Sequence, residues 1–573
     1  MALFNKFSFL SVIAYLGFSA GVLNTAEADN LNNNIYSYSL DNGLQIIVQV
    51  DPRAPVVMSQ MWYQVGSAQE HLGETGLSHF LEHMLFQGSE TFPPSDLIKS
   101  IASHGGLSNA YTYQDGTVYS DFVPKDQLAS VFQLESDRME NLSFGSNQLD
   151  QERKIILEER HQLIDDDPMG DATEILNYMT EMASPYATPV IGWQSDIEQL
   201  SSDDLYRWHA RYYVPNLATL IIVGDVDPNN IYQLATQYFS SIKKAPELSP
   251  KNYPIIFQNG VKHILVRRPG SLPTLIMSFR VPSIASAEKA YAQDPTQNPM
   301  QDPIQDPSAG FGLVVLADLL ANMDSSRFQQ DLVRDQNLAS YIQINYSPLA
   351  RLNTSFQIIA RPMPGVSLAQ LEAAIFTEFE QLAQTPPTDA EIARVITYAE
   401  SQHLYFLDSP FGEASLLGEL NSGAGLDWHL SQNYLTHLQS VNSSELIQLL
   451  NQYLSPDNLV DVDLVPINNL NNPANSANSA NSSPEINLNN LSNLNKINNF
   501  NRGGSQRFSF SNNNLNTNSN LSSNFMGLSE SKKISDLNHD PALLNNLAIR
   551  DREQVNQVNQ DPANSANKLG DFL

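Results

Sequence analysis

An internal echo of strand and helix patterns most constrains how this chain can fold. An Asn-Gly pair followed by two strand-like segments occurs twice, with an offset of 217 residues: Asn42-Gly43 with 44–50 and 56–65, and Asn259-Gly260 with 261–267 and 274–281. Each half alternates strand-like and helical patterns, which is typical of an α+β unit with helices on a largely antiparallel sheet. A chain of 573 residues also exceeds what one hydrophobic core usually serves. The second half therefore looks like a duplicate of the first.

The segment His79-Phe80-Leu81-Glu82-His83 carries two histidines four residues apart with a glutamate between them. On an α-helix, His79 and His83 lie about 40° apart around the axis, and Glu82 lies about 60° from His79. One side of the helix can thus present two zinc ligands and a general base, in the order known as the inverzincin signature. The buried face would be Leu77, Phe80, Leu81, Met84 and Leu85, with Gly88 just beyond the helix. The alternative is ordinary core or surface histidines that share this spacing by chance.

A hydrolytic zinc site normally has three protein ligands, so a third one is expected elsewhere in the chain. The segment 149–165 holds Glu152 and Glu159, which are seven residues apart and therefore within about 20° of each other on a helix. One face would carry both carboxylates. The alternative for these glutamates is a solvated, charged helix face.

The motifs together resemble the pitrilysin or insulysin family of zinc metallopeptidases (M16), above all its small two-domain members related to mitochondrial processing peptidase. The resemblance covers about residues 35 to 466. The segments that carry it, besides the histidine motif, are Asp41-Asn42-Gly43-Leu44, Val65-Gly66-Ser67, Glu70, Gly73, Gly76-Leu77, Phe86-Gln87-Gly88, Asn109 to Thr112, Asp115, Thr117-Val118-Tyr119, Gly192-Trp193, Tyr212 to Asn216 and Val223 to Val226.

This resemblance implies a complete site with one Zn²⁺ per chain. Glu159, which lies 76 residues after His83, would be the third ligand beside His79 and His83, and Glu152 would support the site. Glu158 and His161 remain alternatives, one and two positions away. Glu82 would be the general base. Asn109, Ala110, Tyr111 and Thr112 would form an edge strand that binds an extended peptide through its backbone.

The resemblance also implies two tandem homologous α+β domains, at residues 35–245 (catalytic) and 258–466 (metal-free). In the second half, Phe311 to Asn322 takes the place of the zinc helix but carries no ligand set. Arg334 and Tyr341 resemble a family pair that reaches the catalytic chamber, where an Arg can hold a carbonyl or carboxylate and a Tyr can donate to an oxyanion. The alternative is a surface Arg and a packed Tyr. A homodimer is expected, and a heterodimer with a different subunit stays open.

The expected function is zinc-dependent hydrolysis of peptides or unfolded segments. The alternatives are a catalytically silent peptide-binding or assembly protein on the same scaffold, and one subunit of a heterodimeric peptidase. A formal net charge of −31 disfavours nucleic acid as a partner, because phosphate binding needs clustered Lys and Arg.

The two ends of the chain differ from its body. Lys6, the apolar run 7–23 and Ala26-Glu27-Ala28 resemble a signal peptide over residues 1–28, which predicts a periplasmic or secreted bacterial protein without a stable membrane span. If the segment is not cleaved, it would anchor the protein to a membrane. The absence of cysteine suits an oxidising compartment. The Gln-Asp-Pro repeat at 293–307 is expected to be an extruded loop, and the Asn/Ser-rich residues 467–573 a disordered tail.

Overall fold

The computed structural model describes residues 34–89, 91–92, 96–246, 253, 258–293 and 308–467. The expected signal segment, the repeat between 294 and 307, and the Asn/Ser-rich tail beyond Ile467 lie outside these residues. We refer to residues 34–246 as the first half and to residues 258–467 as the second half. Within these described ranges, every helix is too short or too polar to cross a membrane.

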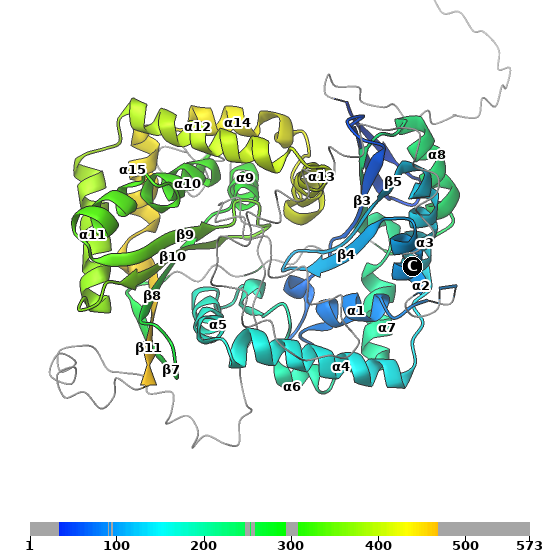
Figure 1. The fold of residues 1–573 in the computed structure, drawn as a ribbon, viewed down its shortest axis with the longest axis horizontal. Helices are drawn as coiled ribbons and strands as arrows, with labels where there is room; N and C mark the ends of the chain where they lie inside the picture. Colours follow the sequence, from blue (N-terminus) through cyan, green and yellow to red (C-terminus); the bar gives the residue numbers. More distant parts are fainter. Residues whose placement is uncertain are drawn as a thin grey trace, which may run out of the picture. The chain divides into compact units, whose positions relative to one another are not determined.

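The first half is built on a six-stranded sheet in the order β1-β2-β6-β3-β5-β4. Figure 1 labels its strands β3, β4 and β5. Only β2 and β6 run parallel, and all other neighbours are antiparallel. The central strands are buried on both faces, since every residue of β6 is buried. The strands are β1 (Ile35–Ser39), β2 (Gln45–Val50), β3 (Val56–Tyr63), β4 (Leu107–Thr112), β5 (Thr117–Pro124) and β6 (Ala218–Gly224).

Helices cover this sheet and connect its strands. The α-helices are α1 (Leu77–Leu85), α2 (Asp96–Ser103), α3 (Leu128–Glu140), α4 (Ser146–Arg160), α5 (Pro168–Thr180), α6 (Gln194–Ile197), α7 (Ser202–Tyr212) and α8 (Pro228–Phe239). Short helical turns are η1 (Ser67–Gln69), η2 (Lys125–Gln127), η3 (His161–Asp165), η4 (Pro185–Ala187) and η5 (Pro215–Leu217).

In the residues that the structure describes, the second half repeats the topology of the first except for an equivalent of β1. Its sheet has the order β7-β11-β8-β10-β9, again with one parallel pair, β7 and β11. Strand by strand, β7, β8, β9, β10 and β11 take the places of β2, β3, β4, β5 and β6. The expected duplication and the α+β fold are confirmed. The strands are β7 (Lys262–Arg268), β8 (Thr274–Val281), β9 (Ala339–Tyr346), β10 (Thr354–Pro362) and β11 (Leu459–Pro466).

The helices of the second half follow the same scheme. The α-helices are α9 (Ile284–Gln293), α10 (Ala309–Ala317), α11 (Leu368–Gln384), α12 (Asp389–Phe406), α13 (Pro410–Gly418), α14 (Leu430–Ser440) and α15 (Ser443–Tyr453). Three π-helical segments, η7 (Asp318–Asn322), η8 (Gln329–Asp335) and η9 (Glu419–Ala424), extend or follow these helices, and η10 is Pro456–Asn458.

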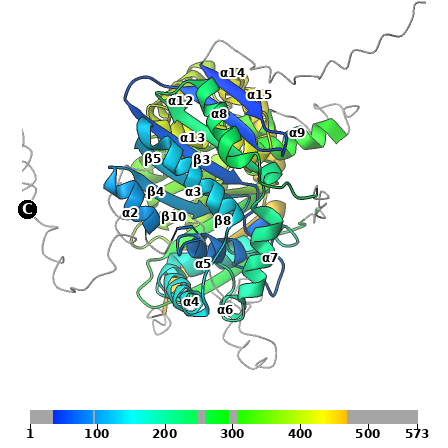
Figure 2. The same cartoon turned by 90° about the vertical axis from the view of Figure 1, so that its right-hand side faces the viewer.

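Each sheet is covered on one face by a helix from the other half. Helix α13 packs against β3 and β6, where Ala414 and Leu417 join a buried cluster with Trp62. In return, α5 packs against β8 and β11, where Ala172 and Leu176 join the buried residues of that sheet. Figures 1 and 2 show α5 beside the strands of the second half. Each half therefore has its own main core, and two smaller buried clusters combine residues of both halves.

Candidate metal centre

Helix α1 carries the histidine motif, and its apolar face is buried as predicted. Leu77, Phe80, Leu81, Met84 and Leu85 are each at most 2% exposed. The first turn is capped by Glu70, whose Oε2 accepts from the backbone N–H of Gly76 (2.7 Å) and whose Oε1 accepts from that of Ser78 (2.8 Å). These contacts satisfy amides that a helix start leaves without intrahelical partners. The helix is thus held in place at its N-terminal end.

Two glycines bring α1 close to the segment before α6. Gly76 has φ +85°, and a Cβ there would lie 2.6 Å from the carbonyl oxygen of Ile191. Gly192 has φ +86°, and a Cβ there would lie 2.6 Å from the Cα of Gly76. Both positions need the left-handed backbone and the missing side chain that glycine provides. Arg160 at the end of α4 donates to the carbonyl of Gly192 (2.6 Å), which connects α4 to this contact.

The two histidines of α1 face one carboxylate oxygen of α4. Oε2 of Glu159 lies 3.6 Å from Nε2 of His79 and 3.6 Å from Nε2 of His83. One ligand atom from each of the three residues lies within 4.8 Å of the others. Tetrahedral zinc with ligands at about 2.0–2.2 Å needs ligand atoms about 3.3–3.5 Å apart. The donor set, its spacing and its partial exposure therefore fit a zinc ion.

The other two candidates for the third ligand lie elsewhere. Glu158 is exposed and accepts a hydrogen bond from Gln162 (2.9 Å). His161 is paired with Asp165 (2.9 Å). The structure therefore brings Glu159, and neither of these two residues, to His79 and His83.

Glu152 fixes the orientation of His83. Its Oε2 lies 3.1 Å from Nδ1 of His83, so that Nδ1–H can donate to it while Nε2 keeps a lone pair facing Glu159. Its Oε1 accepts from the side-chain amide of Gln87 (2.7 Å). Gln87 is in turn held by Gln148, which donates to its backbone carbonyl (3.1 Å). A carboxylate that anchors a metal-binding histidine in this way is a common feature of zinc sites.

Burial and neighbouring carboxylates shift the pKa values of the four central groups. Burial lowers the pKa of His79 well below its ordinary value, which favours the neutral imidazole. Burial also lowers the pKa of His83, but Glu152, Glu82 and Glu159 outweigh it and leave that pKa raised. Burial raises the pKa of Glu159, and it raises the pKa of Glu82 to about 7. Glu82 is 8% exposed.

Thr112 connects Glu82 to the edge strand β4. Its hydroxyl donates to Oε2 of Glu82 (2.5 Å) and lies 3.4 Å from the hydroxyl of Thr117 on β5. Thr117 donates to the carbonyl of Val65 (2.8 Å). The carboxylate next to the histidines is therefore held by a side chain of the same strand that was predicted to bind peptide.

Strand β4 is one of the two edge strands of the first sheet, and it contacts α1. Because side chains alternate along a strand, Ala110 and Thr112 face α1, and Asn109 and Tyr111 face the opposite side of the sheet. Tyr111 packs edge-on against Trp62, with ring centroids 6.3 Å apart. Of the four predicted binding residues, two side chains thus face the histidine helix and two face away.

Arg334 and Tyr341 belong to the second half and have other neighbours. Arg334 is an exposed residue of η8. Tyr341, on the edge strand β9, is 39% exposed and donates its hydroxyl to the side chain of Gln343. The guanidinium of Arg361 lies 5.5 Å from the Tyr341 ring centroid. Their role in a chamber stays a prediction.

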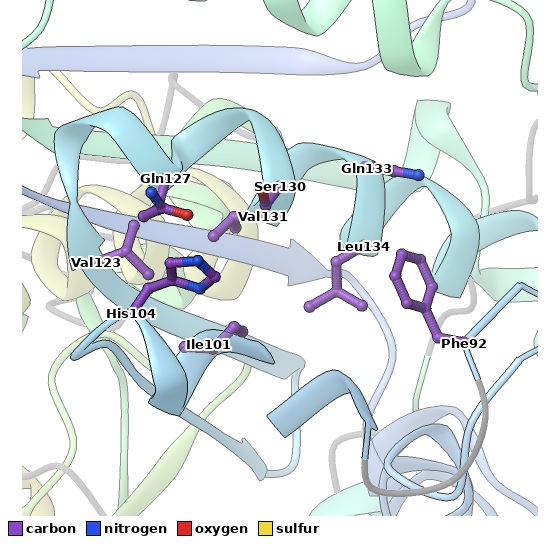
Figure 3. Close-up of a pocket in the computed structure, with 9 residues that line it drawn as sticks. All are labelled: Phe92, Ile101, His104, Val123, Gln127, Ser130, Val131, Gln133 and Leu134. Atoms are coloured by element: carbon purple, nitrogen blue, oxygen red, sulfur yellow. The ribbon is translucent and has the colours of Figure 1, made fainter. Parts of the chain in front are cut away.

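A small cavity lies between α2, α3 and β5, and its lining includes His104 but neither His79 nor His83 (Figure 3). It has a volume of about 110 Å³, well below the roughly 300–1,000 Å³ of typical small-molecule pockets. Its lining is mainly apolar and includes Ile101, Val123 and Leu134. We therefore assign it no ligand.

Two contacts of the site did not follow from the sequence. The sequence places Gln87 in the motif after the histidine helix but does not predict its hydrogen bond to Glu152. Thr112 was expected to touch a peptide, and its bond to Glu82 was not. The β-alternation rule could have placed Thr112 on the side of α1, once the pairing of β4 with β5 was known.

Comparison with known proteins shows to which family the chain belongs. The family model "Insulinase (Peptidase family M16)" matches residues 45–188, and "Peptidase M16 inactive domain" matches residues 199–398. The zinc protease PqqE of Helicobacter pylori is 26% identical over 471 residues, covering 80% of this chain and 99% of the relative.

Two crystal structures share the fold. A protease from Helicobacter pylori has a TM-score of 0.66 at 24% identity, covering 75% of this chain and 99% of its own. The periplasmic protease PqqL from Escherichia coli has a TM-score of 0.62 at 19% identity, covering 84% of this chain and 52% of its own. With both family models matched in succession, and with a zinc protease aligned over nearly its whole length, the chain belongs to the pitrilysin family of M16 peptidases.

Proposed function

We propose that this protein is a zinc-dependent endopeptidase that hydrolyses extended peptides or unfolded segments. The observation that carries the proposal is the convergence of His79, His83 and Glu159 next to Glu82 and the free edge of β4. His79, His83 and Glu159 would hold the ion through Nε2, Nε2 and Oε2. Zinc bound there would supply a Lewis acid that activates water and polarises the scissile carbonyl.

The residues of the chain would do the rest. The unpaired backbone groups of β4 would bind the peptide as an added strand, which holds it extended and selects little by side chain. Glu82 would take the proton from the attacking water and return it to the leaving amine. Thr112 would keep the Glu82 carboxylate in one orientation, and Glu152 would do the same for His83.

A catalytically silent binding protein is the alternative, because one matching family model describes an inactive domain. That model covers residues 199–398, whereas His79, Glu82, His83 and Glu159 all precede it. All four residues lie within the segment 45–188, which matches the other model. This division supports a peptidase with one active half.

Mass spectrometry of a mixed peptide library incubated with the zinc-loaded protein tests the proposal. A Glu82→Gln variant should retain zinc and lose cleavage by about 10²- to 10⁴-fold, the usual contribution of a general base. Glu158→Gln, which alters an exposed carboxylate of the same helix as Glu159, is the matched control and should cleave like the wild type. No cleavage by zinc-replete wild type, combined with tight peptide binding, would favour the silent binding protein.

A further inference from the structure

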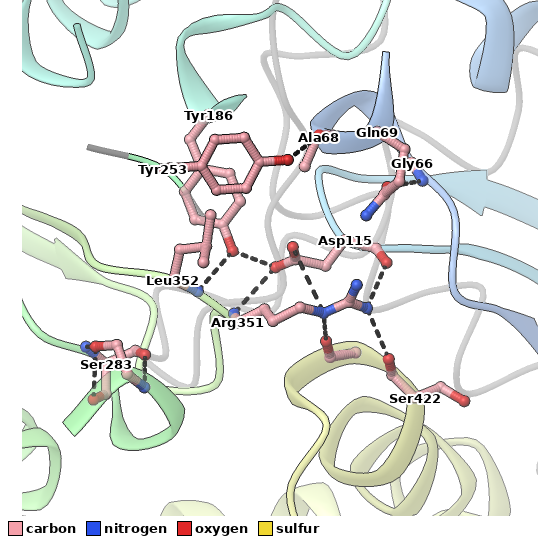
Figure 4. A network of polar contacts seen from close by, with 12 residues as sticks. Gly66, Ala68, Gln69, Asp115, Tyr186, Tyr253, Ser283, Arg351, Leu352 and Ser422 are labelled. Atoms are coloured by element: carbon pink, nitrogen blue, oxygen red, sulfur yellow. Dashed lines mark hydrogen bonds and ion pairs between the residues drawn. The ribbon is translucent and has the colours of Figure 1, made fainter. Parts of the chain in front are cut away.

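Two equivalent hairpins, one from each half, meet at their tips. The β4–β5 hairpin of the first half turns at residues 113–116, and the β9–β10 hairpin of the second half turns at residues 347–353. Asp115 lies at the first tip and Arg351 at the second. Figure 4 shows their side chains in contact, together with Tyr186 and the carbonyl of Ser422.

Arg351 binds the first hairpin and the second half at the same time. Its backbone N–H donates to Oδ2 of Asp115 (3.1 Å), and its Nη2 donates to the backbone carbonyl of Asp115 (3.0 Å). Its guanidinium also donates to the carbonyls of Ser422 (2.9 Å) and Gly423 (2.9 Å) in η9. Asp115 is only 3% exposed. Such a buried, multidentate contact specifies geometry more strongly than an exposed ion pair.

The first hairpin tip is held on its other sides as well. Tyr186 donates its hydroxyl to Asp115 and accepts from the N–H of Leu352 (3.1 Å). The carbonyl of Gln114 accepts from the N–H of Ala68 (2.9 Å). At Gly423, a Cβ would lie 2.5 Å from the hydroxyl oxygen of Tyr113, so η9 approaches the tip closely.

Thr112 is the last residue of β4 before this tip. Its hydroxyl donates to Glu82 (2.5 Å), and it lies three positions before Asp115. A displacement of the tip would therefore also move the hydroxyl that holds the Glu82 carboxylate. The second half carries no counterpart of the histidine and glutamate set, yet it supplies the arginine that fixes this tip.

We propose that Arg351 is a positioning residue through which the second half sets the orientation of Glu82, acting on the β4–β5 hairpin and Thr112. This inference rests on the proposed peptidase function and adds a residue that the family motifs did not indicate. Arg351 itself would touch neither the peptide nor the reacting atoms. Loss of its contacts would let the tip shift and would release Thr112 from Glu82.

A double-substitution experiment on the full chain tests the path of action. Arg351→Met removes the guanidinium donors, keeps the backbone N–H that bonds Asp115 and keeps an unbranched side chain. It should lower kcat by about 10- to 100-fold, as expected for a misplaced catalytic group. Thr112→Val should lower kcat to a similar extent, and Thr112→Ser, which keeps the hydroxyl, should restore it. Combining Arg351→Met with Thr112→Val should give no further loss, because both changes abolish the same hydrogen bond, that of Thr112 to Glu82.

Arg53 provides a matched control for breaking a contact between the halves. Arg53 also joins the halves, since its Nη1 donates to the carbonyl (3.2 Å) and the carboxylate (3.1 Å) of Asp408. It lies between β2 and β3, away from the β4–β5 hairpin tip. Arg53→Met should leave kcat unchanged. Zinc content should stay at the wild-type level in every variant.

Hydrogen–deuterium exchange of residues 107–117 gives a readout that does not need activity. Arg351→Met, or Arg351→Lys if the methionine variant does not fold, should raise exchange at the hairpin tip and leave α1 protected. Unchanged exchange there, unchanged kcat, or losses of Arg351→Met and Thr112→Val that multiply would each overturn the inference. A wild type that cleaves no peptide would instead reject the proposed function. If exchange at the hairpin tip then still rises in the Arg351 variant, Arg351 holds the hairpin even so.

Discussion

Equivalent helices of the two halves carry different side chains at matching positions. Helix α1 lies between β3 and β4, and the helix formed by α10 and η7 lies between β8 and β9. Aligning Leu77 with Leu316 and Met84 with Met323 matches His79, Glu82 and His83 with Asp318, Ala321 and Asn322. One half presents two imidazoles and a carboxylate, and the other an aspartate, an alanine and an asparagine.

The polar residues of the second half are used internally. Asn322 donates to Oδ1 of Asp318 (3.3 Å) and accepts from the N–H of Ile344 on β9 (3.1 Å). The hydroxyl of Tyr398 on α12 donates to the backbone carbonyl of Asn322 (3.1 Å). Helix α12 takes the place of α4 in the order of elements. Tyr398 therefore contacts Asn322 in the second half, where Glu159 faces His83 in the first. The comparison teaches that the fold supplies a place for a site, and that side chains decide whether it is one.

Separating the halves would have the largest effect. Expressed alone, residues 34–246 would lose α13, and with it the cover over buried side chains such as Trp62 and Met58. Each such side chain contributes about 1.5–3 kcal/mol when buried, and a whole domain is stable by only about 5–15 kcal/mol. We expect no cooperative urea unfolding by circular dichroism, and recovery when residues 258–467 are added. Cooperative unfolding of the lone half would show that the halves are independent.

Weakening the support of His83 should have the next largest effect. Glu152→Gln keeps the size of the side chain but removes the charge that faces Nδ1 of His83. We expect zinc affinity to fall by roughly 10- to 100-fold, the usual cost of losing such a partner. Competition with a chromogenic chelator measures it, and Glu158→Gln is the control. Equal affinity in the two variants would mean that Glu152 does not support the metal.

Filling the contact of α13 with the first sheet should cost less. A Cβ at Gly418 would lie 2.0 Å from Cε2 of Trp62, so Gly418→Ala must displace one of the two. We expect the free energy of unfolding to fall by about 1–3 kcal/mol. At Gly145 the nearest atom to an added Cβ is 3.6 Å away, which makes Gly145→Ala a suitable comparison in urea titrations. A fall no larger than that of Gly145→Ala would argue against tight packing of α13 on the first sheet.

The smallest expected effect is a dependence of stability on pH that arises in the second half. A hydrogen bond to Asp461 (2.5 Å) raises the pKa of His263 to about 9, from about 6.5 in an unfolded chain. The folded state therefore binds this proton more tightly. Its stabilising contribution is fully present below about pH 6.5 and is lost as the pH rises to about 9. The equivalent strands β2 and β6 contain no titratable residue.

Urea unfolding at pH 6 and at pH 9.5 measures this contribution. The wild type should lose more stability over the interval than His263→Gln does, by a modest amount because the His263 side chain is 46% exposed and solvent screens the pair. The same loss in both proteins would mean that His263 does not titrate in this way.

Much of the fold could be predicted because it depends on local patterns. The strand pairs at 44–50 with 56–65 and at 261–267 with 274–281 appear as β2, β3, β7 and β8, within two residues at each end. The face of α1 followed from helical spacing alone. The approach of Glu159 to the histidines required the family resemblance, since helix geometry placed Glu152 and Glu159 on one face without saying what that face meets.

The contacts between the halves could not be read from the sequence. Asp115 and Arg351 are 236 residues apart, and no periodicity indicates that two hairpin tips meet. The same holds for the exchange of α5 and α13, because an amphipathic helix shows that it covers something and not which sheet it covers. The side chain of Tyr341 likewise bonds within its own strand, where a motif predicted a chamber residue.

The zinc content of His83→Asn tests the central claim most directly, because it gives the first half the asparagine that the second half has at Asn322. After dialysis against trace zinc, metal analysis of the wild type should give one zinc ion per chain, and that of His83→Asn close to none, with unchanged circular dichroism. A wild type without zinc, or a variant that retains as much as the wild type, would contradict a zinc site at His79, His83 and Glu159.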